Sequence, residues 1–298
     1  RVINLLTVDG DLLNRCELFD ESDLDAALAR FDELHRAPSP ENAATCAWAR
    51  LTDAFNRRDV DEIMSLTKSD GHLDDRRTGV RDLKDGSERL KIVQTMFEYP
   101  PSWRLEIEHM ATRGALLCLS RQILRDVDGA DRPITIELLT VLEVSEDGRA
   151  HDFVNFDSGD FDSAFAELES RYLAGEASTH SRTWSLVADA YATINRHEIP
   201  TGVTHVTDHR HFSVVEGGNL IASLHAAWDL TPDGYVYVEA VHRVDRRRAV
   251  VTHVARGTGQ GGFDAGWRSV NVLTVGTKGV ERCEVLDETD LDVARGLV

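Results

Sequence analysis

The chain has 298 residues, of which 52 are acidic and 33 basic, so its formal net charge at pH 7 is −19. This charge repels nucleic acids and anionic lipid surfaces, and we expect neither as a partner. The four cysteines form no CxxC pair, which argues against a disulfide framework and a zinc knuckle. No apolar stretch is long enough for a membrane span, and we expect a cytoplasmic location.

The first elements of the chain belong to an internal repeat. Residues 3–27 (INLLTVDGDLLNRCELFDESDLDAA) align without a gap with residues 270–294 (VNVLTVGTKGVERCEVLDETDLDVA), and thirteen of the twenty-five positions are identical. A more divergent third copy occupies residues 141–175. The repeat predicts an array that begins inside one unit, and we expect a fragment of a longer polypeptide. The expected parts are a C-terminal hairpin and helix of a preceding or incomplete unit at 1–37, a first domain at 38–176 and a second at 177–298.

The orphan hairpin at 2–34 is marginal alone in water. We expect it to pack on a complete unit or across a dimer, in the place that residues 270–294 would otherwise fill.

The first complete unit changes from helical to strand periodicity near its middle. A helical stripe is predicted at 44–55, a second short helix from residue 60 to about residue 70 and a third helix at 83–98, with a polar strand or turn at 71–77 between the last two. Four strands with short turns follow, which predicts an antiparallel meander at 103–111, 115–125, 134–144 and 150–156. A closing helix follows, with Asp157 or Ser158 as its expected N-cap.

The second unit repeats this order. A helix is predicted at 182–197, a strand-like element at 204–212 and a short apolar helix at 219–228. Four strands follow, at 234–244, 249–257, 267–275 and 280–287. Helices packed on one face of a curved antiparallel sheet form an α+β cone with an open end, which leaves room for a small apolar ligand.

The segment NRRDVDEIMSLTKSDGHLDDRR, followed by a helix, resembles the N-terminal half of the nuclear transport factor 2-like superfamily. That superfamily includes SnoaL-like cyclases, ketosteroid isomerases and non-catalytic binding modules. Three further motifs, DHR, GTGQGG and FDESDLDAALARFDEL, resemble tandem actinobacterial modules attached to larger ATPase, cyclase-like or regulator chains. The resemblance implies tandem cones that form a homodimer or an internal pseudo-dimer, with upstream domains of a longer chain as partners.

The same resemblance implies a proton-transferring aspartate at the end of the first strand. Asp75 in LDDRR matches that position, and Asp208 in VTDHR is its counterpart. In an apolar cone such a carboxylate could act as a general base. Alternatively, Asp75 and Asp208 pair with Arg77 and Arg210, two residues further on, as salt bridges at the rim.

Histidines gather in the second unit, where His205, His209 and His211 alternate along the strand-like element. Neither an acidic second shell nor HExxH spacing accompanies them, so we predict no metal and no cofactor. Imidazole titrates near neutrality, which makes His209 a candidate acid or base beside Asp208, although an exposed edge histidine explains it equally well. Tyr191 is the only tyrosine placed like the oxyanion-stabilising residue of the isomerases.

Two functions follow from these patterns. The first is a non-catalytic or regulatory module that binds a small hydrophobic ligand and dimerises, with a ligand site that comprises Asp75, Arg77, Asp208, Arg210, Trp228 and His253. The alternative is an isomerase or lyase that transfers a proton or dehydrates a cyclic hydrophobic substrate without a cofactor. In that enzyme the catalytic residues would be Asp208, His209 and Tyr191.

Overall fold

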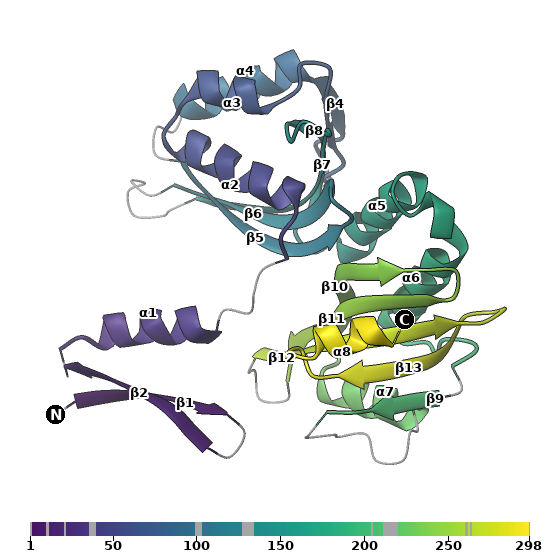
Figure 1. Ribbon diagram of the computed structural model, residues 1–298. Helices are drawn as coiled ribbons and strands as arrows, with labels where there is room; N and C mark the ends of the chain where they lie inside the picture. The colour runs from purple at the N-terminus through teal and green to yellow at the C-terminus, as the bar shows by residue number, and fades with distance from the viewer. Residues whose placement is uncertain are drawn as a thin grey trace. The chain divides into compact units, whose positions relative to one another are not determined.

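The computed structural model describes residues 2–9, 12–20, 22–35, 40–98, 103–126, 134–203, 205–210, 220–259, 262 and 264–297 (Figure 1). The chain divides into two compact units, Arg1–Ser39 and Pro40–Val298. No helix among the described residues is long and apolar enough to cross a bilayer.

The N-terminal unit is a hairpin followed by a helix. Strands β1 (Val2–Asp9) and β2 (Leu12–Asp20) pair antiparallel, and α1 (Leu24–His35) buries Ala27. Its register repeats at the other end of the chain. Leu6 lies opposite Cys16, as Leu273 lies opposite Cys283, and in both hairpins the register shifts after the threonine that follows the leucine. The repeat found in the sequence is therefore a repeat of structure. The packing of this hairpin on a complete cone or across a dimer stays a prediction.

A six-stranded sheet forms the base of the first domain, by which we mean residues 43–157. Its strands are β3 (His72–Asp75), β4 (Asp82–Asp85), β5 (Trp103–Arg113), β6 (Leu117–Asp126), β7 (Thr135–Val144) and β8 (Ala150–Asp157), in the order β4-β3-β8-β7-β6-β5. The predicted antiparallel meander of β5 to β8 is confirmed. Strand β3 extends it by pairing parallel to β8, so the sheet is mixed rather than purely antiparallel.

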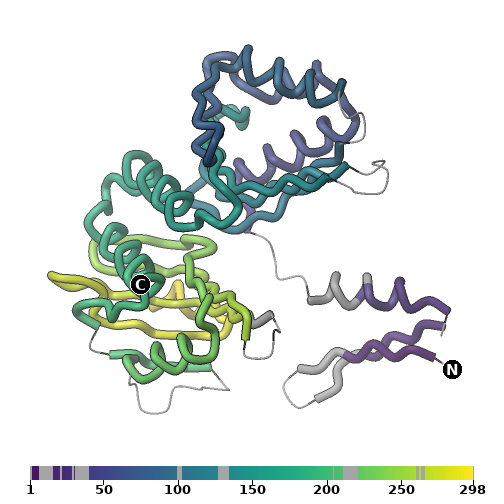
Figure 2. The backbone as a smooth tube through the Cα atoms, turned by 180° about the vertical axis from the view of Figure 1, so that it is seen from behind, coloured from purple at the N-terminus to yellow at the C-terminus, as the bar shows by residue number. Residues whose placement is uncertain are grey.

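Three helices, α2 (Ala43–Asn56), α3 (Val60–Leu66) and α4 (Gly86–Glu98), cover one face of this sheet (Figure 1 and, from behind, Figure 2). Residues 83–85, predicted as the start of the third helix, belong instead to β4. The reason is local, because the Asp85 carboxylate accepts hydrogen bonds from the backbone N–H groups of Ser87 and Glu88 and so caps α4 at its first turn.

Both ends of α2 are fixed to the sheet by asparagine side chains. Asn42 caps the helix by accepting from the N–H groups of Ala44 and Thr45, while its amide donates to two carbonyls of the β5–β6 turn. At the other end Asn56 exchanges two hydrogen bonds of 2.9 Å with the backbone of Leu105 on β5. The helix is therefore held over the sheet at a fixed height.

Helix α5 (Phe161–Ala174) and the 3₁₀ turn η1 (Ser178–His180) lead from the first domain to the second. The cap of α5 is Asp160, which accepts from the N–H of Ser163, rather than Asp157 or Ser158 as predicted. Asp157 is occupied elsewhere, because its carboxylate accepts from the N–H and the hydroxyl of Thr78.

The second domain, residues 181–297, has the same plan with a smaller sheet. Its helices are α6 (Ser181–Asn195), α7 (Leu220–Leu230) and α8 (Leu291–Gly296), and its strands are β9 (His205–Asp208), β10 (Tyr235–Val244), β11 (Arg248–Thr258), β12 (Asp264–Val275) and β13 (Val280–Leu286). The strand order is β10-β11-β12-β13-β9, with β9 parallel to β13 as β3 is to β8. Asn195, the last residue of α6, binds the backbone of Val236 as Asn56 binds that of Leu105. The chain thus has the predicted α+β fold of tandem cones.

Two apolar cores occupy the larger unit. One lies between α2 to α4 and the first sheet, and includes Trp48, Leu51 and Phe153. The other joins the opposite face of that sheet to α5, α6 and the second sheet, with Leu139, Leu168 and Val251 among its members. Because the second core crosses from one domain to the other, Pro40–Val298 is one compact unit.

Candidate ligand-binding site

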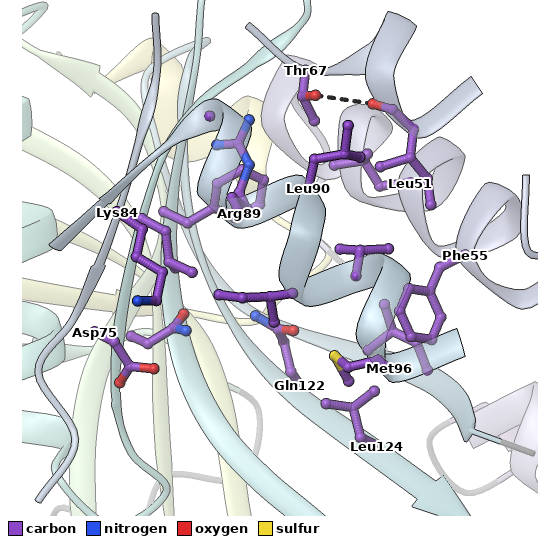
Figure 3. A pocket seen from close by; sticks show the side chains of 18 of the residues that line it. Leu51, Phe55, Thr67, Asp75, Lys84, Arg89, Leu90, Met96, Gln122 and Leu124 are labelled. Atoms are coloured by element: carbon purple, nitrogen blue, oxygen red, sulfur yellow. Dashed lines mark hydrogen bonds between the residues drawn. The ribbon is translucent and has the colours of Figure 1, made fainter. Parts of the chain in front are cut away.

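A cavity of about 750 Å³ lies between the first sheet and helices α2, α3 and α4. Its wall is mainly apolar, with Leu51 and Phe55 from α2, Leu90 and Met96 from α4, and Leu124 from β6 (Figure 3). These side chains point inward because every second residue of a strand, and every third or fourth of a helix, shares a face. A volume of this size suits a small organic molecule, since ligand pockets typically measure roughly 300–1,000 Å³.

A row of polar side chains crosses the first sheet. The strands β3, β8, β7, β6 and β5 each contribute one residue to it. They are registered opposite one another as Asp75, Asn155, Thr140, Ser120 and His109. The Thr140 hydroxyl donates to Asn155 Oδ1 at 2.8 Å, and His109 Nδ1 lies 2.9 Å from Ser120 Oγ. Gln122, on the wall of the cavity, donates to the Thr140 hydroxyl. Of this row, Asp75 and Asn155 line the cavity, so the mainly apolar wall has polar groups where it meets β3 and β8.

Asp75 ends β3 at the edge of this cavity and is 6% exposed. Arg77 clamps its carboxylate, with Nε donating to Oδ1 at 2.9 Å and Nη2 to Oδ2 at 2.7 Å, and the N–H of Arg77 also reaches Oδ1. Burial alone would raise the pKa of Asp75, but hydrogen bonds and charge from Arg77, helped by the Asn155 amide, hold that pKa below its ordinary value. The carboxylate is thus an ionised, engaged group, which is the arrangement of the salt-bridge alternative.

Residues 48–153, from within α2 to within β8, match the family model of the SnoaL-like domain. The first domain is a SnoaL-like domain. Its resemblance to the SnoaL-like domains of the nuclear transport factor 2-like superfamily is thereby confirmed.

Several solved structures are similar to part of the chain. AusH from Aspergillus nidulans is 17% identical with a TM-score of 0.35, over 40% of this chain and 86% of its own. IdmH from Streptomyces antibioticus, a candidate polyketide cyclase, is 19% identical with a TM-score of 0.33, over 42% of this chain and 97% of its own. A candidate ketosteroid isomerase from Kribbella flavida is 19% identical with a TM-score of 0.31, over 38% of this chain and 76% of its own. No curated protein matches the chain.

The second domain repeats the aspartate–arginine clamp of the SnoaL-like domain. Arg210 Nε donates to Asp208 Oδ1 at 2.9 Å and Nη2 to Oδ2 at 2.7 Å, and the Arg210 N–H again reaches Oδ1. The neighbouring strand differs, because Asp208 is registered with Val285 where Asp75 is registered with Asn155. The clamp is therefore common to both domains, whereas the polar row is not.

The three residues predicted as catalytic have different surroundings. His209 is half exposed, and its Nε2 lies 3.3 Å from a Glu284 carboxylate oxygen. Tyr191 is a residue of α6 whose hydroxyl lies 3.1 Å from His253 Nδ1, and burial raises the pKa of this tyrosine. The catalytic role of Asp208, His209 and Tyr191 stays a prediction.

The other predicted binding residues lie apart from the cavity of the SnoaL-like domain. Burial first, and the charge of Arg210 second, lower the pKa of His253 to about 4, so its imidazole is neutral near pH 7. Trp228 stacks on His197 with ring centroids 5.1 Å apart. His211 lies outside the described residues, and no group of three or more metal-binding side chains gathers among those that the structure describes.

Sequence reasoning located Asp75 and Arg77 but missed Asn155, Gln122 and Arg89, which also line the cavity. Asn155 interrupts the apolar run FVNF, and that interruption was the available signal, whereas Gln122 lies in the mixed segment LCLSRQILR and gave none. Arg89 gave none, because a basic residue in an amphipathic helix usually faces solvent.

Proposed function

We propose that the SnoaL-like domain binds a small, mainly apolar molecule in the cavity above its sheet, without transforming it. The cavity carries this proposal, because most of its wall is apolar and a smaller part is made of polar and charged side chains such as Asp75, Asn155 and Arg89. Such a division suits a ligand with an apolar body and a few polar atoms. The regulatory and dimerisation roles expected from the sequence belong to the same proposal and rest on the tandem arrangement of the domains.

The state of Asp75 favours binding over proton transfer. A general base works best with a pKa near the working pH and with an oxygen free to take the proton. Arg77 engages both carboxylate oxygens of Asp75 and helps to hold its pKa below the ordinary value. In this arrangement Asp75 orients Arg77 and Asn155 rather than taking a proton from a substrate.

Filling the cavity tests this function. The Leu90→Trp variant places an indole on the cavity side of α4, and we expect it to weaken binding of the neutral fluorescent probe Nile red at least tenfold. The matched variant Leu83→Trp adds the same ring to β4, where Leu83 is 65% exposed, and should bind the probe as the unaltered chain does. Fluorescence titration measures both. Equal binding by Leu90→Trp and the unaltered chain, or no binding by the latter, would refute the proposal.

A cofactor-free isomerase or lyase is the second candidate, and one observation favours it. Asp75 lines the cavity at the end of β3, the position that the family resemblance assigns to a proton-transferring aspartate. If Asp75 were such a base, the chain would catalyse deuterium exchange at the carbon beside the carbonyl of a cyclic ketone, and Asp75→Asn would abolish the exchange. Proton NMR in D₂O measures this. Exchange no faster than in buffer, or equally fast with Asp75→Asn, would eliminate this candidate.

A further inference from the structure

Arg89 is a buried arginine on the wall of the cavity. It lies in the first turn of α4, is 9% exposed, and is shown beside Leu90 in Figure 3. Its guanidinium group lies over the ring of Phe153, 4.8 Å from the centroid. A buried charged group loses its interactions with water, and hydrogen bonds or an opposite charge have to replace them.

The protein supplies those partners only in part. Nη2 donates to the carbonyl of Lys68 at 3.2 Å and Nη1 to that of His151 at 3.4 Å, which are long for hydrogen bonds from a cation. Among the described residues, no carboxylate oxygen lies within 4 Å of the guanidinium. Burial lowers the pKa of Arg89, and the more distant charge of Asp152 only partly opposes this effect. Of the five N–H donors that an arginine carries, two have partners in the part of the chain that the structure describes, and both bonds are long.

Other basic side chains on the same wall are already neutralised. Lys68 pairs with Asp147, Arg77 with Asp75 and Lys84 with Asp82. Of the five charged side chains that the described residues place on this wall, four are basic and one is acidic, although the chain carries a net charge of −19. The wall therefore holds a positive charge, at Arg89, that the described residues leave without a paired anion.

We infer that the ligand of this cavity is an amphipathic monocarboxylic acid whose carboxylate pairs with Arg89 and whose apolar body lies between α2, α4 and β6. The planar guanidinium matches a carboxylate with two parallel hydrogen bonds. A phosphate dianion fits less well, because it brings a second charge into a mainly apolar cavity that also holds the Asp75 carboxylate. This inference rests on the proposed binding function and adds the class of ligand to it.

The test compares an acid with its own ester. Pyrenebutyric acid and its methyl ester share an apolar fluorescent body and differ in charge, so the ratio of their dissociation constants isolates the effect of the carboxylate. At pH 7 we expect the acid to bind at least tenfold more tightly than the ester, a difference of about 1.4 kcal/mol. Arg89→Met should reduce that ratio to near one while the ester still binds, and Arg89→Lys should keep part of the preference.

Controls separate this inference from the function on which it rests. Arg125→Met removes a positive charge from an exposed ion pair with Glu106 outside the cavity, and should leave the ratio unchanged. If the unaltered chain binds acid and ester equally, the inference is wrong and the binding function stands. If it binds neither, both are wrong. Should Arg89→Met fail to fold, as circular dichroism would show, the ratios for the unaltered chain and for Arg89→Lys still decide, because a ratio near one in the unaltered chain overturns the inference.

Discussion

Replacing Glu169 with alanine is expected to lower the free energy of unfolding by ~3–5 kcal/mol, the range for breaking a buried ion pair by removing one partner. Glu169 on α5 holds Arg113, which is 1% exposed, through Nε at 3.0 Å and Nη2 at 2.6 Å. It also accepts from the indole N–H of Trp184 on α6. Nη1 of Arg113 donates to the carbonyl of Val238 on β10 at 3.0 Å, so the charge joins elements of both domains. Urea unfolding followed by circular dichroism measures the loss.

Two comparisons show whether burial causes this effect. Glu106→Ala breaks the exposed pair with Arg125 and should change stability by less than ~1 kcal/mol. The double variant Arg113→Met with Glu169→Leu removes both charges and should be more stable than Glu169→Ala alone, because no buried charge remains without a partner. A loss in Glu169→Ala no larger than that in Glu106→Ala would show that Arg113 finds another partner or water.

The elements of the fold were predictable where one periodicity ran undisturbed. Helix α2 shows a stripe that includes Trp48, Leu51 and Phe55, and the meander alternates between turns, so both were found close to their limits. The parallel pairing of β3 with β8 was not predicted, because a four-residue strand has too little pattern to name its partner. The start of α4 and the cap of α5 were misplaced for a related reason. Several aspartates stand near each helix start, and only the structure shows which of them is free to cap.

The candidate site was predictable in part for a different reason. Asp75 and Arg77 are two residues apart, so their pairing is a local property that the sequence displays, and it recurs at Asp208 and Arg210. The polar row and Arg89 depend on strand register and on the rotation of α4 about its axis. Asn155 and Asp75 are eighty residues apart and become neighbours only through the parallel pairing of β3 with β8. The pairing of residues close together in the sequence was therefore predictable, whereas the residues that folding brings together from distant segments were not.

The Arg77→Met variant is expected to reverse the contribution of Asp75 to the pH dependence of stability. In the unaltered chain the pKa of Asp75 lies below its ordinary value, so its contribution is present above the ordinary pKa and is lost as the pH falls through the folded-state pKa. Without Arg77 the effect of burial remains and raises the pKa of this carboxyl. Its stabilising effect is then present at low pH and is lost as the pH rises through the raised pKa. We expect the variant to be less stable than the unaltered chain by ~1–3 kcal/mol at pH 7 and by much less at pH 3.

The Asp75→Asn background shows whether the two residues act as a pair. An amide has no charge to lose between pH 3 and pH 7, so Arg77→Met added to Asp75→Asn should change the free energy of unfolding by the same amount at both values. Urea titrations of the four proteins at each pH give this comparison, and titrations of other groups cancel in it. An effect of Arg77→Met that is equal at pH 3 and pH 7 in the unaltered background would mean that Arg77 does not control the charge of Asp75. The pKa of Asp75 would then be set by the rest of the cavity. That result would support a proton-transferring Asp75 and would weaken the argument for binding alone.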